Sequence, residues 1–371
     1  MKFITLLIKP ASSKCQMHCK YCFYLDECDN RNISDCGIMS LETTHHLIEK
    51  VLNQFNEQSL ITFSFQGGEP TIASLNWFQI FVNEVNQLKK DYHNIHYTIQ
   101  TNGLLLDDKW IDFFCTNNFL IGISIDGPIH DKLRIDSNHN PTLNKIIYNL
   151  QKLQIAKLDY NILTVLSKEL ALMPKELYQF YVKHNIDIIQ IIPCLPGLDK
   201  KENQYSLTPE LYASFYKYLF DLWLEEIYDG HYRSFNLIDN IINLFNGINP
   251  NQCGLLGYCL PQLIIEADGN VYPCDFYALD KYKIGNINYN SLKEIVTNKI
   301  NINFRNEKRR SFTDCFICKY KTICNGGCKR QNICYFTDSY CGHQDILSYI
   351  ESKIDDNFYF HLKKAIENSY K

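Results

Sequence analysis

The chain has 371 residues, of which 46% are hydrophobic and 21% are charged; this balance supports a sizeable globular core and excludes disorder throughout the chain. Its 37 basic and 41 acidic residues leave a net charge of −4, without the basic excess that a broad nucleic-acid-binding surface needs. Cysteine is unusually frequent, with 16 copies. That number is too small for a disulfide scaffold and too large to be incidental, so we expect the cysteines to have a chemical role.

The first apolar segment, the six residues FITLLI, ends at Lys9 and Pro10. It is shorter than the apolar core of a signal peptide, and no other stretch reaches the ~20 apolar residues of a membrane-spanning helix. The sequence therefore predicts a cytoplasmic protein with no membrane or nucleic-acid partner. In that reducing compartment, clustered cysteines bind metals or act in catalysis more often than they form disulfides.

Over the first 200 residues, short β-rich runs alternate with stretches of helical spacing. The predicted strands are 3–9, 61–66, 95–100, 120–125, 160–166 and 186–192. The predicted helices between them are 41–57, 75–92, 107–117, 140–156 and 174–185. Such alternation is typical of parallel βα units, and six of them predict an α/β fold with a partial (β/α)6 barrel.

The pattern changes in the second part of the chain. Helices are predicted over 209–230 and 237–245, followed by a cysteine-rich region with glycine turns and a last helical stretch over 346–371. We therefore expect two domains, 1–235 and 236–371.

Three cysteines with the spacing C-x3-C-x2-C follow the first predicted strand: Cys15, Cys19 and Cys22. Three thiolates on one loop can hold three irons of a [4Fe–4S] cluster and leave the fourth iron open for a small molecule. The alternative is a zinc site that takes its fourth ligand from elsewhere, such as His18.

This cysteine motif, followed by Phe23 and Tyr24, resembles the signature of radical S-adenosylmethionine (SAM) enzymes. Gln66-Gly67-Gly68-Glu69-Pro70 stands after the second predicted strand, where that family has its GGEP motif. The resemblance implies that the Glu69 region receives the methionine amino group of SAM. It also implies a set of SAM-contacting residues: Tyr21, Tyr24, Gln66, Gly67, Gly68, Glu69, Ser124, Asp126, Arg134 and Leu195.

Eight further cysteines lie in the second part of the chain. Their spacing resembles the SPASM domain, which binds auxiliary [4Fe–4S] clusters in radical SAM enzymes that modify peptides and proteins. The resemblance implies two fully ligated clusters, one held by Cys253, Cys259, Cys274 and Cys328 and the other by Cys315, Cys318, Cys324 and Cys341. The alternative is a pair of zinc ribbons. Five cysteines fit neither motif: Cys28, Cys36, Cys115, Cys194 and Cys334.

Segments 7–13, 65–71 and 272–277 look like those of anaerobic sulfatase-maturating enzymes. That resemblance implies oxidation of a Cys or Ser in a Cys/Ser-x-Pro/Ala-x-Arg segment of an unfolded or nascent sulfatase to Cα-formylglycine. A 5′-deoxyadenosyl radical would remove a hydrogen atom from Cβ, and Asp275 would act as the catalytic base. The implied partners are the sulfatase polypeptide and an electron donor such as flavodoxin or ferredoxin.

Two alternatives stay open at this point. One is another SPASM enzyme, which forms thioethers, epimers or crosslinks in a ribosomal peptide; only fourteen residues precede Cys15, which disfavours an N-terminal leader-binding domain. The other is a zinc or electron-transfer protein without catalytic activity.

Overall fold

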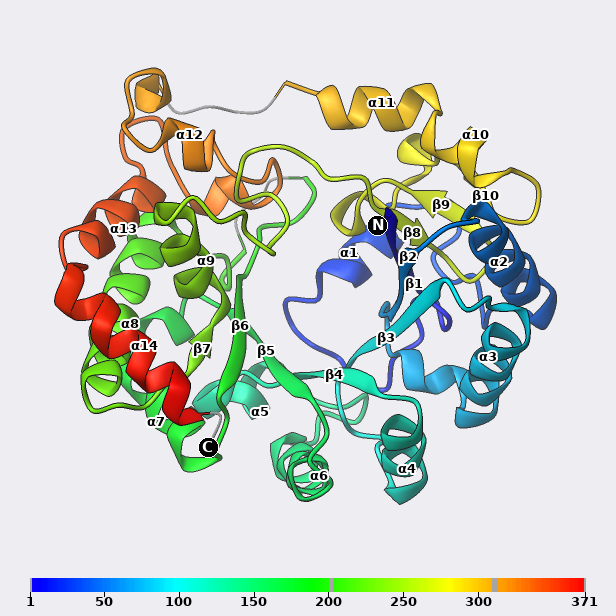
Figure 1. Ribbon diagram of the computed structural model, residues 1–371, viewed down its shortest axis with the longest axis horizontal. Coiled ribbons are helices and arrows are strands. Elements are labelled where there is room, and N and C mark those ends of the chain that lie inside the picture. The colour runs from blue at the N-terminus through cyan, green and yellow to red at the C-terminus, as the bar shows by residue number, and fades with distance from the viewer. Residues whose placement is uncertain (1, 200–202, 309–312, 370–371) are drawn as a thin grey trace. The chain divides into compact units, whose positions relative to one another are not determined.

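The computed structural model describes residues 2–199, 203–308 and 313–369 (Figure 1). The chain folds into two compact units, each made of segments that are separate in the sequence. Unit one consists of Met1–Ser124, Asp131–Tyr160 and Pro261–Glu307, and unit two of Ile125–His130, Asn161–Leu260 and Lys308–Lys371. The expected division into two domains, 1–235 and 236–371, stays a prediction.

Unit one is built on a mostly parallel sheet with the strand order β10-β9-β8-β1-β2-β3-β4. Its strands are β1 (Lys2–Ile8), β2 (Ser59–Phe65), β3 (His93–Thr101), β4 (Phe119–Ser124), β8 (Leu263–Ile265), β9 (Asn270–Tyr272) and β10 (Gly285–Asn286). Strand β1 pairs in parallel with both β2 and β8, in a register that aligns Ile8 with Phe65 and with Ile265. Residues that follow these strands therefore emerge at one edge of the sheet, where α/β folds place their chemistry.

Helices α2, α3 and α4 lie along one side of strands β1–β4 (Figure 1). Aromatic rings fix this packing: Phe78 of α3 lies 4.8 Å from Phe65 of β2, and Phe114 of α4 lies 5.2 Å from Phe119 of β4. Such tilted ring pairs add to the hydrophobic burial of the helix faces. The helical segments of this unit are α1 (Phe23–Asp29), α2 (Leu41–Gln54), η1 (Pro70–Ala73), α3 (Leu75–Leu88), α4 (Asp108–Thr116), α5 (His130–Leu133, whose first residue belongs to unit two), α6 (Leu143–Ile155), η4 (Asp275–Tyr277), η5 (Asp280–Tyr282), α10 (Leu292–Val296) and α11 (Lys299–Asn306).

Unit two contains the strands β5 (Tyr160–Leu166, whose first residue belongs to unit one), β6 (Ile188–Pro193) and β7 (Ser234–Phe235), which pair in parallel. Its longest helix packs through the fully buried Trp223, which donates to the carbonyl of Arg233 and lies in a tilted ring contact 6.0 Å from Phe358. The helical segments are η2 (Gly127–Ile129), η3 (Leu170–Leu172), α7 (Pro174–Lys183), α8 (Pro209–Tyr228), α9 (Asn236–Phe245), η6 (Thr313–Phe316), α12 (Lys321–Cys324), η7 (Gln331–Cys334), α13 (Gly342–Glu351) and α14 (Asp356–Ser369).

The predicted α/β class and all six predicted strands are confirmed, with ends that differ by a few residues at most. The C-terminal stretch differs from its prediction, because α13 and α14 replace one continuous helix. The Asp355 carboxylate accepts from the backbone N–H of Phe358 and starts α14 separately. Positions 370–371 of the predicted stretch lie outside the described residues. Among the described residues, no helix has both the length and the apolarity needed to cross a membrane.

Candidate active site

The glycines of the Gln66–Pro70 motif pack against the segment that leads into Cys15. The backbone N–H of Gly68 donates to Ser12, and that of Glu69 donates to Lys14. A Cβ at Gly68 would stand 2.4 Å from the Lys14 carbonyl oxygen. Only glycine permits this approach, so the motif fixes the start of the cysteine loop.

Glu69 lies at the centre of a buried hydrogen-bond cluster. Its side chain is fully buried and accepts from the backbone and hydroxyl of Thr71, the hydroxyl of Thr101 and the backbone N–H of Asn102. Burial raises the pKa of Glu69, although these hydrogen bonds act in the opposite direction. A contact between its carboxylate and the methionine ammonium of SAM stays a prediction.

The Cys15, Cys19 and Cys22 loop brings three thiols into electrostatic contact. Burial around the Cys15 sulfur and the nearby charges of Glu69, Cys19 and Cys22 raise the pKa of Cys15 to about 12, although part of the residue is exposed to solvent. A thiol whose pKa is raised in this way needs a cationic group beside it to be held as a thiolate. An all-sulfur donor set of three fits an iron–sulfur cluster with one open position.

The other predicted SAM contacts lie in both units. In unit one, the Arg134 guanidinium stands 5.4 Å from the centre of the Tyr21 ring, and Ser124 accepts from Gln100 at 3.1 Å. In unit two, Asp126 is buried and accepts from the backbone N–H of Val165 at 3.0 Å, and Leu195 is partly buried. Their roles toward SAM stay predictions.

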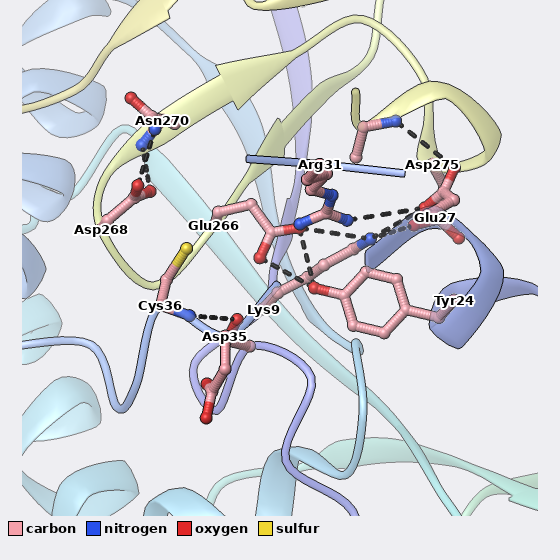
Figure 2. A network of polar contacts seen from close by, with 12 residues as sticks. Lys9, Tyr24, Glu27, Arg31, Asp35, Cys36, Glu266, Asp268, Asn270 and Asp275 are labelled. Carbon is pink, nitrogen blue, oxygen red and sulfur yellow. Dashed lines mark hydrogen bonds and ion pairs between the residues drawn. The ribbon is translucent and has the colours of Figure 1, made fainter. Parts of the chain in front are cut away.

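A network of buried charges occupies the carboxyl edge of the sheet in unit one (Figure 2). The Lys9 ammonium lies 2.9 Å from Asp275, 3.6 Å from Glu266 and 4.0 Å from Glu27. Arg31 of the segment after α1 lies 2.9 Å from Glu266 and 3.7 Å from Glu27. The side chains of Lys9, Arg31, Glu27 and Glu266 are at most 2% exposed, whereas Asp275 is 15% exposed. Asp275 is therefore the member of the network that solvent or a ligand can reach.

The balance of charge in this network determines how its members hold protons. Three carboxylates face two cations, which leaves one negative charge in excess. Burial raises the pKa of Glu27 to about 8, and the Asp275 charge adds to the effect while Lys9 and Arg31 oppose it. Burial alone would lower the pKa of Lys9, but the three carboxylates raise it above its usual value. The network therefore keeps Lys9 charged at neutral pH and shifts Glu27 toward its protonated form.

Asp275 follows the predicted cluster ligand Cys274 and begins the short helix η4. Gln66, which directly follows β2, donates to Asp275 at 2.9 Å. Phe276 packs edge-on against Phe23 of α1 at 5.2 Å and anchors the helix. The structure therefore brings two predicted site residues, Gln66 and Asp275, into direct contact.

Tyr24 belongs to the same network. Its hydroxyl is 2.8 Å from each carboxylate oxygen of Glu266, and the Lys9 ammonium lies 3.7 Å from the centre of its ring. Burial and the charge of Glu266 raise the pKa of Tyr24 well above its usual value. Tyr24 is 3% exposed, and its predicted contact with SAM stays untested.

Sequence reasoning missed Lys9, Glu27, Arg31 and Glu266 as site residues. Lys9 carried a usable signal, because a charged residue directly after an apolar strand stands at the catalytic edge of an α/β sheet. Glu266 has the same position after the short apolar strand β8. Glu27 and Arg31, on and just after α1, had no such signal.

The cysteines of one predicted auxiliary set line a single cavity in unit two. Cys315, Cys318, Cys324 and Cys341 surround it together with Tyr320 and Leu347. Burial and the charges of the other three thiols raise the pKa of Cys324 to about 12. A four-thiol cavity of this kind fits a closed cluster, while the assignment of each ligand stays a prediction.

The other predicted set is divided between the units. Cys253, Cys259 and Cys328 belong to unit two, and Cys274 belongs to unit one. Gly254 adopts a positive φ of 83°, and a Cβ there would stand 2.7 Å from Cβ of Cys328. The chain after Cys253 therefore passes directly beside Cys328.

The five cysteines outside both motifs differ in their surroundings. Cys28, Cys194 and Cys334 are buried, Cys36 is partly buried and Cys115 is exposed. The Cys334 thiol points to the carbonyl of Cys194 at 3.7 Å. The three buried cysteines therefore behave as small apolar residues of the core.

Comparison with known proteins places these features in a family. A radical SAM superfamily model matches residues 10–181, and an iron–sulfur cluster-binding SPASM model matches residues 259–319. A cysteine-type anaerobic sulfatase-maturating enzyme of Clostridium novyi is 39% identical over 334 residues, which cover 89% of each chain. A serine-type enzyme of Bacteroides thetaiotaomicron is 28% identical over 354 residues, covering 89% of this chain and 83% of the relative.

A solved structure agrees with this placement. Native anSMEcpe with bound AdoMet and the Kp18Cys peptide superposes with a TM-score of 0.87 at 32% identity, covering 95% of this chain and 98% of that chain. The chain therefore belongs to the family of anaerobic sulfatase-maturating enzymes, within the radical SAM superfamily.

Proposed function

We propose that this protein oxidises a cysteine side chain of a sulfatase polypeptide to Cα-formylglycine. The observation that carries the proposal is the placement of Asp275: its carboxylate is partly exposed, held by Gln66 and Lys9, and adjacent in sequence to Cys274. A base at that position suits a reaction that removes a proton from the substrate. Family membership supplies the reaction class.

The cofactors proposed are SAM and three [4Fe–4S] clusters. Cys15, Cys19 and Cys22 would hold the cluster with the open iron, and the two sets of four cysteines would hold the auxiliary clusters. When bound, these groups supply the one-electron chemistry that removes a hydrogen atom from the substrate Cβ and accepts a second electron. One of the two auxiliary clusters is supported by a cavity that four cysteines line together: Cys315, Cys318, Cys324 and Cys341.

The residues of this chain would handle the proton. Conversion of CH2–SH to a thioaldehyde requires the loss of one hydrogen atom, one proton and one electron, and water then gives the aldehyde and hydrogen sulfide. Asp275 would accept the thiol proton on Oδ2, because Oδ1 is buried beside the Lys9 ammonium. Lys9 and Gln66 would keep the carboxylate aimed at the substrate, because both contact it from the ends of adjacent strands.

Cysteine rather than serine is the proposed target. The cysteine-type relative is 39% identical to this chain, against 28% for the serine-type relative, and the peptide in the similar solved structure is named for a cysteine. The proposed reductant is a one-electron carrier such as flavodoxin or ferredoxin.

The test is mass spectrometry of peptides incubated anaerobically with reduced holoenzyme and SAM. One peptide carries Cys-x-Pro-x-Arg, and matched peptides carry Ser or Ala in place of Cys. We expect the mass change of CH2SH to CHO in the Cys peptide, capture of the product by a hydrazide and no change in the Ala peptide. Cleavage of SAM with a crosslinked or epimerised peptide and no aldehyde would instead indicate another SPASM chemistry.

A further inference from the structure

The side chain of Asn102, directly after β3, reaches the first cysteine of the Cys15–Cys22 loop. Its amide Nδ2 lies 3.7 Å from Cys15 Sγ. The orientation of the amide is fixed, because Oδ1 accepts from the backbone N–H of Leu104 at 3.0 Å and from the Gln16 side chain at 3.2 Å. A backbone N–H can only donate, so the oxygen of Asn102 must face Leu104 and the NH2 group must face the sulfur.

Glu69 holds Asn102 in this position from the opposite side. The backbone N–H of Asn102 donates to Glu69 at 2.7 Å, and the neighbouring Thr101 hydroxyl donates to the same carboxylate at 2.7 Å. Asn102 is 7% exposed and Glu69 is fully buried. A continuous hydrogen-bond chain thus links the Glu69 carboxylate to Asn102 and Asn102 to the Cys15 sulfur.

The surroundings of the sulfur show why this contact matters. Cys15 Sγ also accepts from the backbone N–H of Met17 at 3.4 Å, so two N–H groups point at it. The charge of Glu69 acts on the same thiol. Hydrogen bonds to cluster sulfurs and nearby net charge are two of the terms that set the reduction potential of an iron–sulfur cluster.

We propose that Asn102 is a positioning residue that tunes the SAM-binding cluster through its N–H···S hydrogen bond to Cys15. The bond stabilises the extra electron of the reduced cluster, so it sets how strongly reducing that cluster is. Glu69 acts through Asn102 by holding its backbone. The inference rests on the proposed role of Cys15, Cys19 and Cys22 as ligands of that cluster.

The test is a redox titration of reconstituted holoenzyme followed by electron paramagnetic resonance, using the signal that changes when SAM is added. In N102L the amide is lost, and we expect a more negative midpoint potential. In N102D the carboxylate keeps the bonds from Leu104 and Gln16 but replaces the donor by a negative oxygen, so the shift should be larger. The matched control is N117L, which removes an amide that donates to the Phe113 carbonyl at the end of α4; its midpoint should equal that of the wild type.

Iron content and SAM-dependent signal shape establish that each variant holds the cluster. N102D keeps the size and the acceptor bonds of Asn102, so its midpoint decides the question even where N102L fails to load iron. A loaded N102D whose midpoint equals that of the wild type would overturn the inference and leave the ligand assignment intact. A SAM-responsive signal that persists in C15A would overturn both.

Discussion

The Lys9 ammonium and the Asp275 carboxylate form a 2.9 Å ion pair between two regions that are far apart in the sequence. Strand register explains how they meet. Ile8 aligns with Phe65 of β2 and with Ile265 of β8, and the backbone N–H of Lys9 donates to the Ile265 carbonyl. The next residue on each strand therefore emerges at the same edge, which places Lys9 between Gln66 and Glu266 and within reach of Asp275.

Removal of this cation should destabilise the fold strongly. In K9M an apolar chain of similar length replaces the ammonium and leaves the three carboxyl groups facing Arg31 alone. Removing one partner of a buried ion pair costs about 3–5 kcal/mol, and formylglycine production should fall with it. Urea denaturation of the variant and wild type measures the change.

The control for K9M is K14M, which breaks the ion pair between Lys14 and Asp35. Both of those side chains are about two-fifths exposed, and surface pairs of this kind contribute less than about 1 kcal/mol. Equal denaturation midpoints for K9M and K14M would show that the buried network does not depend on Lys9.

Replacement of Asp275 by asparagine should separate the two halves of the reaction. D275N keeps the shape of the side chain and can no longer take up a proton. Cleavage of SAM should remain detectable, while aldehyde formation falls by roughly 10²–10⁴-fold, the usual contribution of a positioned general base. Chromatography of 5′-deoxyadenosine and mass spectrometry of the peptide measure the two products in one reaction.

The matched variant for D275N is D280N, which changes an exposed carboxylate of η5 that accepts from the backbone of Asn32. Aldehyde formation by D280N should stay near that of the wild type. If D275N made aldehyde as fast as D280N does, Asp275 would lose its role as the base.

The sequence predicted those parts of the molecule that depend on local signals. The six strands were predicted correctly because each is a short run of β-branched and aromatic residues bounded by glycine, asparagine, aspartate or proline. Gln66 and Asp275 were both singled out, and the structure joins them by a hydrogen bond.

The parts that were missed depend on contacts across the sequence. Glu27 lies on α1 and looks like an exposed helical glutamate, yet its side chain is 1% exposed because Lys9 and Arg31 lie beside it. Glu266 meets Tyr24 across 242 positions. No local pattern encodes such distances, because they follow from the register of β8 on β1.

The proton on Glu27 should make stability depend on pH. Its pKa in the fold is about 8, against 4.5 for the ordinary side chain, with burial as the main cause. A carboxyl group whose pKa rises on folding stabilises the fold fully at pH values below its unfolded pKa. This stabilisation is lost as the pH increases through the folded pKa. The wild type should therefore lose stability between about pH 5 and pH 8 relative to E27Q, by on the order of 1–3 kcal/mol.

Denaturation of both holoenzymes across that pH range measures the effect. The groups that face Glu27 are Lys9, Arg31 and Asp275, and they are unchanged in E27Q. The control is E57Q. The pKa of Glu57 is lowered by its hydrogen bond and ion pair with Lys2, so Glu57 changes the stability of the fold below pH 4.5 and not between about pH 5 and pH 8. Parallel stability curves for wild type and E27Q would contradict a protonated Glu27.

Iron analysis should reveal how many clusters the cysteines hold. Three [4Fe–4S] clusters require about twelve irons per chain. C324S removes a ligand from the cavity that Cys315, Cys318 and Cys341 also line, so its iron content should fall toward about eight, with the SAM-responsive signal intact. C115S changes an exposed cysteine outside all three sets and should keep the full iron content. Stoichiometric zinc in the wild type, or equal iron in C324S and C115S, would refute this assignment of the cavity.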